Sequence, residues 1–151
     1  SCSSLTIRFT ILIDKIMIRN SKQVTQAISF AGLQNKKIHP TDVDILLEVD
    51  NKFVIIGEVK KINNDIPFGQ KKALERIIKR WEYGNYILLK IVHDFNNDNS
   101  DIPASICKVE KYYYKEKWYD IKPEFKNKTL VEIINKLANH WNHDKLKLSS
   151  N

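Results

Sequence analysis

Runs of β-branched and apolar residues predict strands in the first half of the chain. Val43–Val49 and Phe53–Val59 are both of this kind, and Asp50-Asn51-Lys52 between them has the composition of a tight turn. The two segments therefore predict a hairpin, and their nearly continuous apolar character predicts a central sheet covered on both faces. Leu5–Ile18 also favours a strand, although a buried helix is the alternative for so apolar a run.

Apolar residues at helical spacing predict two helices on either side of this hairpin. Asn20–Ala31 has the pattern of a short amphipathic helix. Pro67-Phe68-Gly69 is expected to break the chain, and the apolar stripe from Ala73 to Trp81 then predicts a helix that ends near Gly84. The polar side of this second helix is strongly basic.

The rest of the chain predicts a further strand, a second hairpin and a closing helix. Thr129 and Glu132 have the spacing of a capping box, which marks the start of the helix. The expected elements are a strand over Tyr86–Val92, a hairpin of Ile106–Tyr114 with Trp118–Ile121, and a helix from Leu130 to Trp141. The whole pattern predicts one α/β domain spanning residues 1–151, with a central mixed β-sheet flanked by helices and an appended hairpin and helix.

Composition narrows the class of partner. The 151 residues carry 25 Lys and Arg against 18 Asp and Glu, a formal net charge of +7, which favours a polyanion such as nucleic acid. No run is long and apolar enough for a bilayer span, so we expect no membrane association. Two cysteines without metal or disulfide spacing favour a reducing, cytoplasmic compartment. Abundant Lys, Ile and Asn are typical of an A+T-rich genome, phage or mobile element.

The first hairpin brings charged residues together. A three-residue turn pairs Val49 with Phe53, and the same register places Asp44 opposite Glu58 and Asp42 opposite Lys60. Because residues two apart in a strand share a face, the acids and the lysine converge within apolar strands.

Two carboxylates side by side in an apolar setting require a neutralising cation. Mg²⁺ suits such a pair, because it binds one or two carboxylates, keeps several waters and accepts a phosphate oxygen. Lys60 can then orient or help deprotonate an attacking water, or neutralise charge on the phosphate. The residues thus predict hydrolysis of a phosphodiester. Lys61 and the basic helix supply the expected nucleic-acid contacts, namely Lys71, Lys72, Arg76, Lys79 and Arg80.

Thr41-Asp42-Val43-Asp44, followed by Gly57-Glu58-Val59-Lys60 with Glu58 fourteen positions after Asp44, resembles the PD-(D/E)xK nuclease superfamily. The resemblance covers roughly Asn20–Val92 and implies a restriction endonuclease-like core. It implies Asp44 and Glu58 as metal ligands, Lys60 as the catalytic lysine and Gln70 as an auxiliary site residue.

The match to the superfamily leaves two assignments open. Asp42 is the alternative to Asp44 as the family's Asp. Many members also carry an acid on the first helix, whereas Asn20–Ala31 has none and Asp14 is the nearest acid.

The resemblance implies a Mg²⁺-dependent endonuclease that cuts double-stranded DNA at specific sites, of homing or restriction type. We expect a homo-oligomer, a dimer or tetramer, because cutting two strands requires two sites. A Holliday-junction resolvase is the alternative enzyme. A catalytically silent nucleic-acid-binding module that keeps the fold and the basic surface is the alternative of another class.

Overall fold

The computed structural model describes residues 29, 31–38, 40–82, 84–96 and 101–149. Contacts divide the chain at Pro40 into two units. The second unit, Thr41–Asn151, contains every helix and strand discussed below. The predicted elements over Leu5–Ile18 and most of Asn20–Ala31 lie outside the described residues, and the expectation of a single domain stays a prediction.

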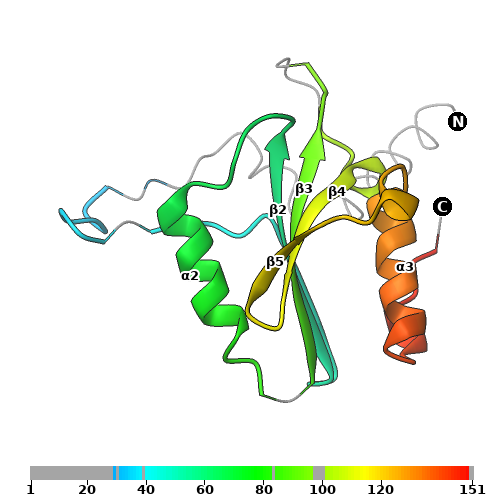
Figure 1. Cartoon of the computed structure of the whole chain (residues 1–151). Coiled ribbons are helices and arrows are strands. Elements are labelled where there is room, and N and C mark those ends of the chain that lie inside the picture. The colour runs from blue at the N-terminus through cyan, green and yellow to red at the C-terminus, as the bar shows by residue number, and fades with distance from the viewer. Residues whose placement is uncertain (1–28, 30, 39, 83, 97–100, 150–151) are drawn as a thin grey trace, which may run out of the picture. The chain divides into compact units, whose positions relative to one another are not determined.

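The second unit is an α/β structure built on a five-stranded mixed sheet (Figure 1). The strands lie in chain order, so that each one pairs with the next along the chain. The second and third strands are parallel to each other, and the other three pairs are antiparallel. The strands are β1 (Ile45–Val49), β2 (Phe53–Lys61), β3 (Asn85–His93), β4 (Lys108–Tyr114) and β5 (Lys117–Asp120).

Two helices cover opposite faces of this sheet (Figure 1). The helix α2 (Phe68–Ile78) connects the parallel strands β2 and β3, as a crossover between parallel strands requires. The helix α3 (Leu130–His140) follows β5 and packs on the other face. The described residues therefore confirm the coarse expectation of a mixed sheet flanked by helices, with a second hairpin and a closing helix.

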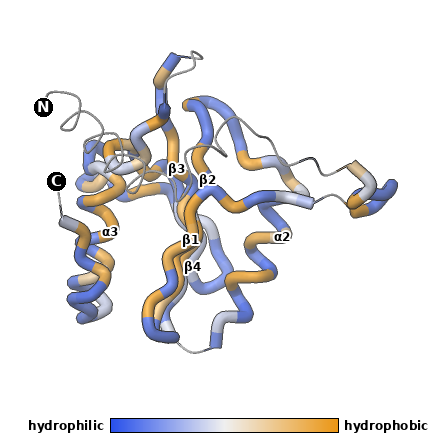
Figure 2. Tube along the Cα trace, turned by 180° about the vertical axis from the view of Figure 1, so that it is seen from behind, coloured by the Kyte–Doolittle hydropathy of each residue, from blue (hydrophilic) through white to orange (hydrophobic). Residues whose placement is uncertain are grey.

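Each face of the sheet has its own apolar core. Alternate residues of β2 point to opposite faces, so Val54 and Ile56 pack with Leu74 and Ile78 of α2. The tube coloured by hydropathy shows the central strands as largely apolar and both helices as two-sided (Figure 2). The core beneath α3 is the larger, and its buried members are Phe53, Ile55, Ile87, Leu89, Ile91, Cys107, Val109, Leu130, Ile133, Ile134, Ala138 and Leu146.

The turn of the first hairpin fixes the register of β1 on β2. Asp50 and Asn51, the two central residues of the turn that Lys52 closes, both have positive φ, at 53° and 56°, which matches the twist of the flanking strands. The Lys52 N–H closes this turn on the Val49 carbonyl oxygen at 2.9 Å. Val49 pairs with Phe53, which confirms the predicted register.

Several predicted boundaries are wrong. The sequence predicts a break over Pro67-Phe68-Gly69, but Pro67 is the N-cap residue of α2 and the helix begins at Phe68. The helix ends at Ile78, well before Gly84. The strand β1 begins at Ile45 and lies at an edge of the sheet, where Leu46 is 62% exposed. The prediction that both faces of the strand are covered is thus wrong for β1 and confirmed for β2.

The second hairpin and the closing helix agree with their sequence patterns to within a few residues. Thr129 Oγ1 accepts from the Glu132 N–H at 3.3 Å, and a Glu132 carboxylate oxygen accepts from the Thr129 N–H at 2.8 Å. This reciprocal pair confirms the capping box at the start of α3. Within the part of the chain that the structure describes, no helix has the length and apolar content to cross a membrane.

Candidate functional site

The two acids of the motif meet where β2 leaves the core. Glu58 lies in β2 on the face that α2 covers, and its side chain is only 1% exposed. Asp44 directly precedes β1, and the pairing of Ile45 with Gly57 places it next to Glu58. The Asp44 side chain is anchored there, because its Oδ2 accepts a hydrogen bond from the Val59 N–H at 2.8 Å. The predicted juxtaposition of Asp44 and Glu58 is confirmed.

Two further predicted side chains contact Glu58. Gln70, in the first turn of α2, donates from Nε2 to Glu58 Oε2 at 3.0 Å and to the Asp42 carbonyl oxygen at 3.3 Å. Lys60, two residues along β2 and on the same face, places its Nζ 3.8 Å from Glu58 Oε2. Because the Lys60 side chain is 25% exposed, its ammonium is within reach of solvent and of a bound substrate.

The ionisation of Glu58 is strongly perturbed. Burial, and after it the neighbouring charge of Asp44, raise the pKa of Glu58 from 4.5 to about 7. The polar backbone of Asp44 and the charge of Lys60 oppose this rise but do not cancel it. Near neutral pH the Glu58 carboxyl group is therefore close to the midpoint of its titration.

One oxygen of this carboxyl group has no partner. Glu58 Oε1 is buried and accepts no hydrogen bond, whereas its Oε2 is held by Gln70. An unsatisfied buried oxygen is costly unless a ligand completes its environment. Together with the adjacent Asp44 carboxylate, it fits a divalent cation that prefers oxygen ligands and keeps several waters. Across the described ranges, no group of three or more His, Cys, Asp and Glu side chains lies close enough to hold a metal.

The structure also bears on the alternative acids. The side chain of Asp42 is exposed, and Asp42 contributes its backbone carbonyl, which holds Gln70. Asp44, by contrast, has both a hydrogen bond into β2 and an electrostatic effect on Glu58. The geometry thus favours Asp44 over Asp42 as the ligand beside Glu58. Asp14 lies outside the described residues.

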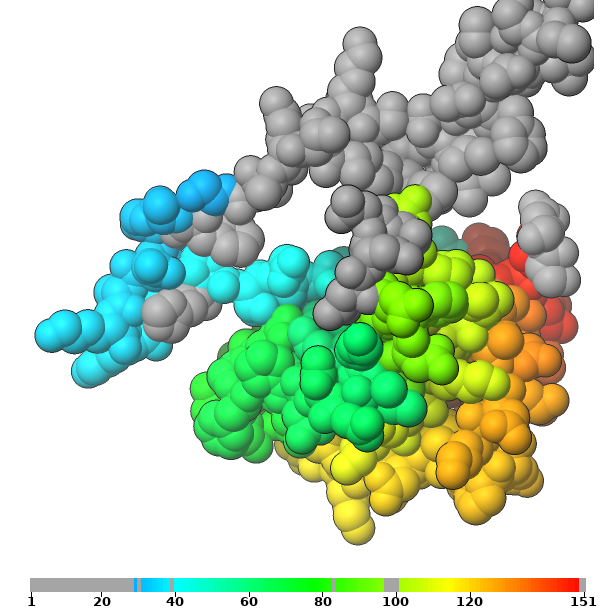
Figure 3. All heavy atoms as spheres, turned by 90° about the horizontal axis from the view of Figure 1, so that it is seen from above, coloured from blue at the N-terminus to red at the C-terminus, as the bar shows by residue number. Residues whose placement is uncertain are grey.

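The basic side chains predicted on α2 are more engaged than a solvated face would be. Lys72 Nζ lies 3.1 Å from Glu75 Oε2, and Lys79 Nζ lies 3.6 Å from Glu116 Oε1 of the β4–β5 hairpin. The space-filling view shows the atoms of α2 directly beside this hairpin (Figure 3). Two of these ammonium groups therefore already have a carboxylate partner within the protein.

The remaining predicted contacts do not form one surface. Lys71 stacks over Trp118, with its Nζ 4.9 Å from the ring centroid. Arg76 and Arg80 are exposed. Lys61 belongs to β2 and follows Lys60, so its side chain points to the opposite face of the sheet. The structure thus brings Arg76 and Arg80 to the surface of α2 and separates Lys61 from them.

Sequence patterns missed two charged residues buried on the same face. Glu75 lies within α2, where Trp118 Nε1 donates to its Oε1 at 2.7 Å. Burial raises the pKa of Glu75, but this hydrogen bond and the ammonium of Lys72 outweigh burial and lower it overall. Lys90 is buried in β3, directly beside Glu58 in the strand register. The sequence signal that could have indicated Lys90 is a single lysine within the otherwise apolar strand Asn85–His93, since lysine is rarely buried without a partner.

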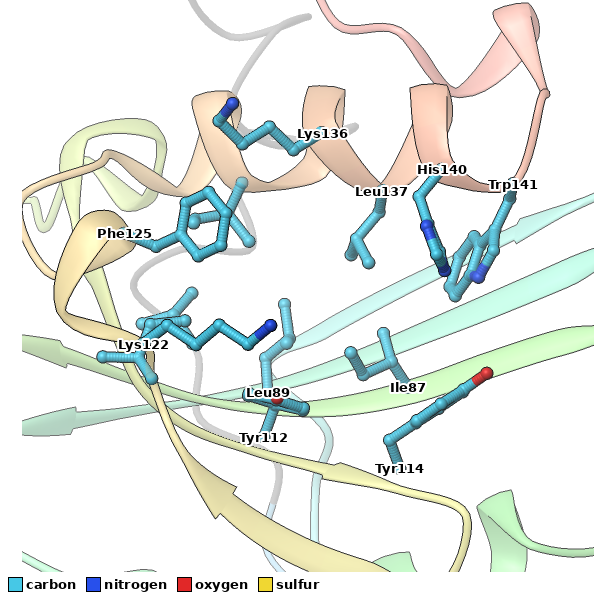
Figure 4. A pocket seen from close by; sticks show the side chains of 13 residues that line it. Ile87, Leu89, Tyr112, Tyr114, Lys122, Phe125, Lys136, Leu137, His140 and Trp141 are labelled. Carbon is cyan, nitrogen blue, oxygen red and sulfur yellow. The ribbon is translucent and has the colours of Figure 1, made fainter.

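A cavity of about 430 Å³ lies on the other side of the sheet, between α3 and strands β3 and β4. Its wall is mostly apolar and aromatic, with Lys122, Lys136 and His140 among the lining residues (Figure 4). None of the predicted site residues lines this cavity. The candidate chemistry therefore belongs to the α2 face.

Comparisons with protein-family models, with curated proteins and with solved structures found no match to this chain.

Proposed function

We propose that this protein is a Mg²⁺-dependent DNA endonuclease of the PD-(D/E)xK type, with a restriction endonuclease-like core. The observation that carries the proposal is the Glu58 carboxyl group, which is 1% exposed, has one oxygen without a partner and shares its site with Asp44 and Lys60. A structural ion pair would satisfy both oxygens, whereas a metal ligand leaves one for the ion.

The roles of the side chains follow from their contacts. Asp44 and Glu58 hold Mg²⁺, which when bound polarises the phosphodiester and favours ionisation of water. Gln70 fixes the Glu58 carboxylate through Oε2, which leaves Oε1 as the oxygen that would bind the ion. Lys60, 3.8 Å from Glu58, orients the attacking water or neutralises charge that develops on the phosphate.

The substrate is proposed from charge and from the resemblance of the motif. The net charge of +7 and the exposed Arg76 and Arg80 suit the phosphate backbone of DNA. We propose site-specific cleavage of double-stranded DNA by a homo-oligomer, as in a homing or restriction enzyme of a mobile element or phage. A Holliday-junction resolvase is the alternative that the same site supports.

Incubation of the protein with supercoiled plasmid, cloned duplex DNA and a synthetic four-way junction, each with Mg²⁺ and with EDTA, tests the proposal. We expect Mg²⁺-dependent cleavage by the wild type and none by Lys60→Gln. Lys126→Gln is the matched control. This substitution also removes one positive charge, but from an exposed lysine near Cys107 and Val109 of the core beneath α3. The variant should cleave like the wild type.

The products decide between the alternatives. Discrete duplex fragments support a site-specific endonuclease, and selective cutting of the junction supports a resolvase. Absence of Mg²⁺-dependent cleavage with any of these substrates, alongside tight salt-sensitive binding, would overturn the nuclease proposal and leave a nucleic-acid-binding module.

A further inference from the structure

Lys90 is the one lysine that is buried among the residues that the structure describes. Its side chain is 6% exposed, and its Nζ lies 2.9 Å from Asp65 Oδ1 and 2.5 Å from Glu110 Oε2. Burial lowers the pKa of Lys90, but these two carboxylates outweigh burial and raise it overall, so the ammonium stays charged. A permanent positive charge thus lies inside the α2 face of the sheet.

The strand register places this charge in line with the catalytic acids. Glu58 of β2 pairs with Lys90 of β3, and Lys90 pairs with Lys111 of β4. Paired residues on adjacent strands point to the same face, so these three positions form one row across the sheet. Two strand spacings separate the ends of the row, a distance of about 10 Å. Lys90 and Lys111 therefore lie within a few nucleotides of a phosphate bound at Glu58.

The carboxylate of Asp65 accepts a hydrogen bond from Lys90 and lies within the electrostatic reach of two further lysines. Asp65 belongs to the loop between β2 and α2 and is 92% exposed. Its pKa is lowered chiefly by the hydrogen bond and the charge of Lys90, and also by the charges of Lys111 and Lys71. These lysines come from β3, β4 and α2, so the fold, and not one local segment, gathers them.

A purely structural pair explains only part of this arrangement. Glu110 already gives the buried ammonium of Lys90 a carboxylate partner, and an ion pair with an acid as exposed as Asp65 stabilises a fold very little. Asp65 is instead the solvent-facing partner of Lys90, as the exposed carboxylate of Asp120, 3.6 Å from Lys111 Nζ, is for Lys111. An oxygen of a nucleic-acid phosphate has the same charge and hydrogen-bonding capacity as a carboxylate oxygen.

We infer that Lys90 and Lys111 form a binding site for a backbone phosphate of the nucleic-acid substrate, and that Asp65 occupies this site until the phosphate replaces it. The inference rests on the proposed function, because it places the site next to Glu58 and Lys60. It adds a phosphate contact from within the sheet to those that α2 supplies.

Binding without cleavage isolates this site. The probe is a fluorescently labelled duplex oligonucleotide in EDTA, measured by anisotropy from about 50 to about 200 mM salt. Lys111→Gln should reduce the slope of log K against log salt by about 0.9, the contribution of one phosphate contact on duplex DNA. Lys126→Gln, which removes the same charge outside the site, should keep the wild-type slope.

Asp65→Asn tests whether the phosphate replaces Asp65, because it removes the carboxylate that competes with the phosphate for Lys90 and leaves every lysine in place. It should bind the duplex up to about fivefold more tightly than the wild type, in keeping with the value of an exposed ion pair. Asp144→Asn is the matched control. Like Asp65→Asn, it removes one negative charge and breaks an ion pair, here the exposed pair of Asp144 with Lys147. Thermal unfolding of each variant verifies that it is folded.

The outcomes separate this inference from the proposed function. An unchanged slope for Lys111→Gln, or equal affinities for Asp65→Asn and Asp144→Asn, would overturn the phosphate site even if the wild type cleaves DNA. The expected changes in a protein that cleaves nothing would support the site and overturn the nuclease. Absence of salt-dependent binding by the wild type would overturn the site as well.

Discussion

Replacement of Glu58 by Gln should stabilise the metal-free protein above pH 7. In the wild type, folding buries this carboxyl group beside Asp44 and raises its pKa from 4.5 to about 7. The neutral amide of Gln has nearly the same shape, can accept from Gln70 through its oxygen and can donate to Asp44 through its nitrogen. The variant thus keeps the packing and removes the need to ionise a buried group.

The size of this stabilisation follows from the linkage between proton binding and folding. Because the pKa is raised on folding, the folded wild type binds more protons than the unfolded chain between pH 4.5 and about 7, and its stability falls over this range. The difference between the two pKa values corresponds to about 3 kcal/mol at 1.36 kcal/mol per pKa unit. The advantage of Glu58→Gln should therefore be near zero at pH 4 and reach about 3 kcal/mol, or roughly 6–12 °C in Tm, at pH 8.

Urea unfolding in EDTA, followed by tryptophan fluorescence at several pH values, measures this difference. Comparison of variant with wild type cancels the titration of the other carboxyl groups. Glu82→Gln, which replaces an exposed acid beyond the end of α2, is the control and should stay within about 0.5 kcal/mol of the wild type at every pH. A difference that does not grow between pH 4 and pH 8, or that favours the wild type, would refute the assigned environment of Glu58.

Three further predictions test the metal site, the hairpin contact and the helix cap. Mg²⁺ affinity of the wild type should fall about tenfold per pH unit below pH 7, because the proton on Glu58 must leave first; calorimetry in buffers of different ionisation enthalpy should detect its release. Trp118→Phe should cost about 1–3 kcal/mol in urea unfolding, since it leaves Glu75 buried without its Nε1 donor. Thr129→Ala should cost about 1 kcal/mol through loss of the α3 cap, and Thr129→Ser should restore it; equal stability of all three proteins would contradict the capping role.

Local sequence was sufficient for the first hairpin and for the residues that it brings together. The turn residues Asp50 and Asn51 adopt positive φ, and this turn sets the register that places Asp44 beside Glu58. Gln70 was found by resemblance, and it reaches Glu58 because α2 follows β2 after a short loop. These relations depend on neighbours in the chain, which is why the sequence could reveal them.

Helix limits and strand coverage were less predictable. The sequence placed a break at Pro67, Phe68 and Gly69, yet α2 begins directly after Pro67, because a proline at the N-terminus of a helix lacks only a donor that would be unpaired anyway. The apolar run of β1 predicted a central strand, but apolar content does not specify how many neighbours a strand has, and β1 lies at the edge of the sheet.

The sequence by itself determined the order of strands and helices, the hairpin register and the meeting of two acids with a lysine, because each follows from side-chain periodicity and short turns. Only the tertiary structure decided which charges are buried and which partners they have. Lys90 meets Asp65 and Glu110 from three different segments, and Glu75 meets Trp118 across the gap between α2 and the second hairpin. Burial and charge pairing depend on distances through space, and residues far apart in the chain set both.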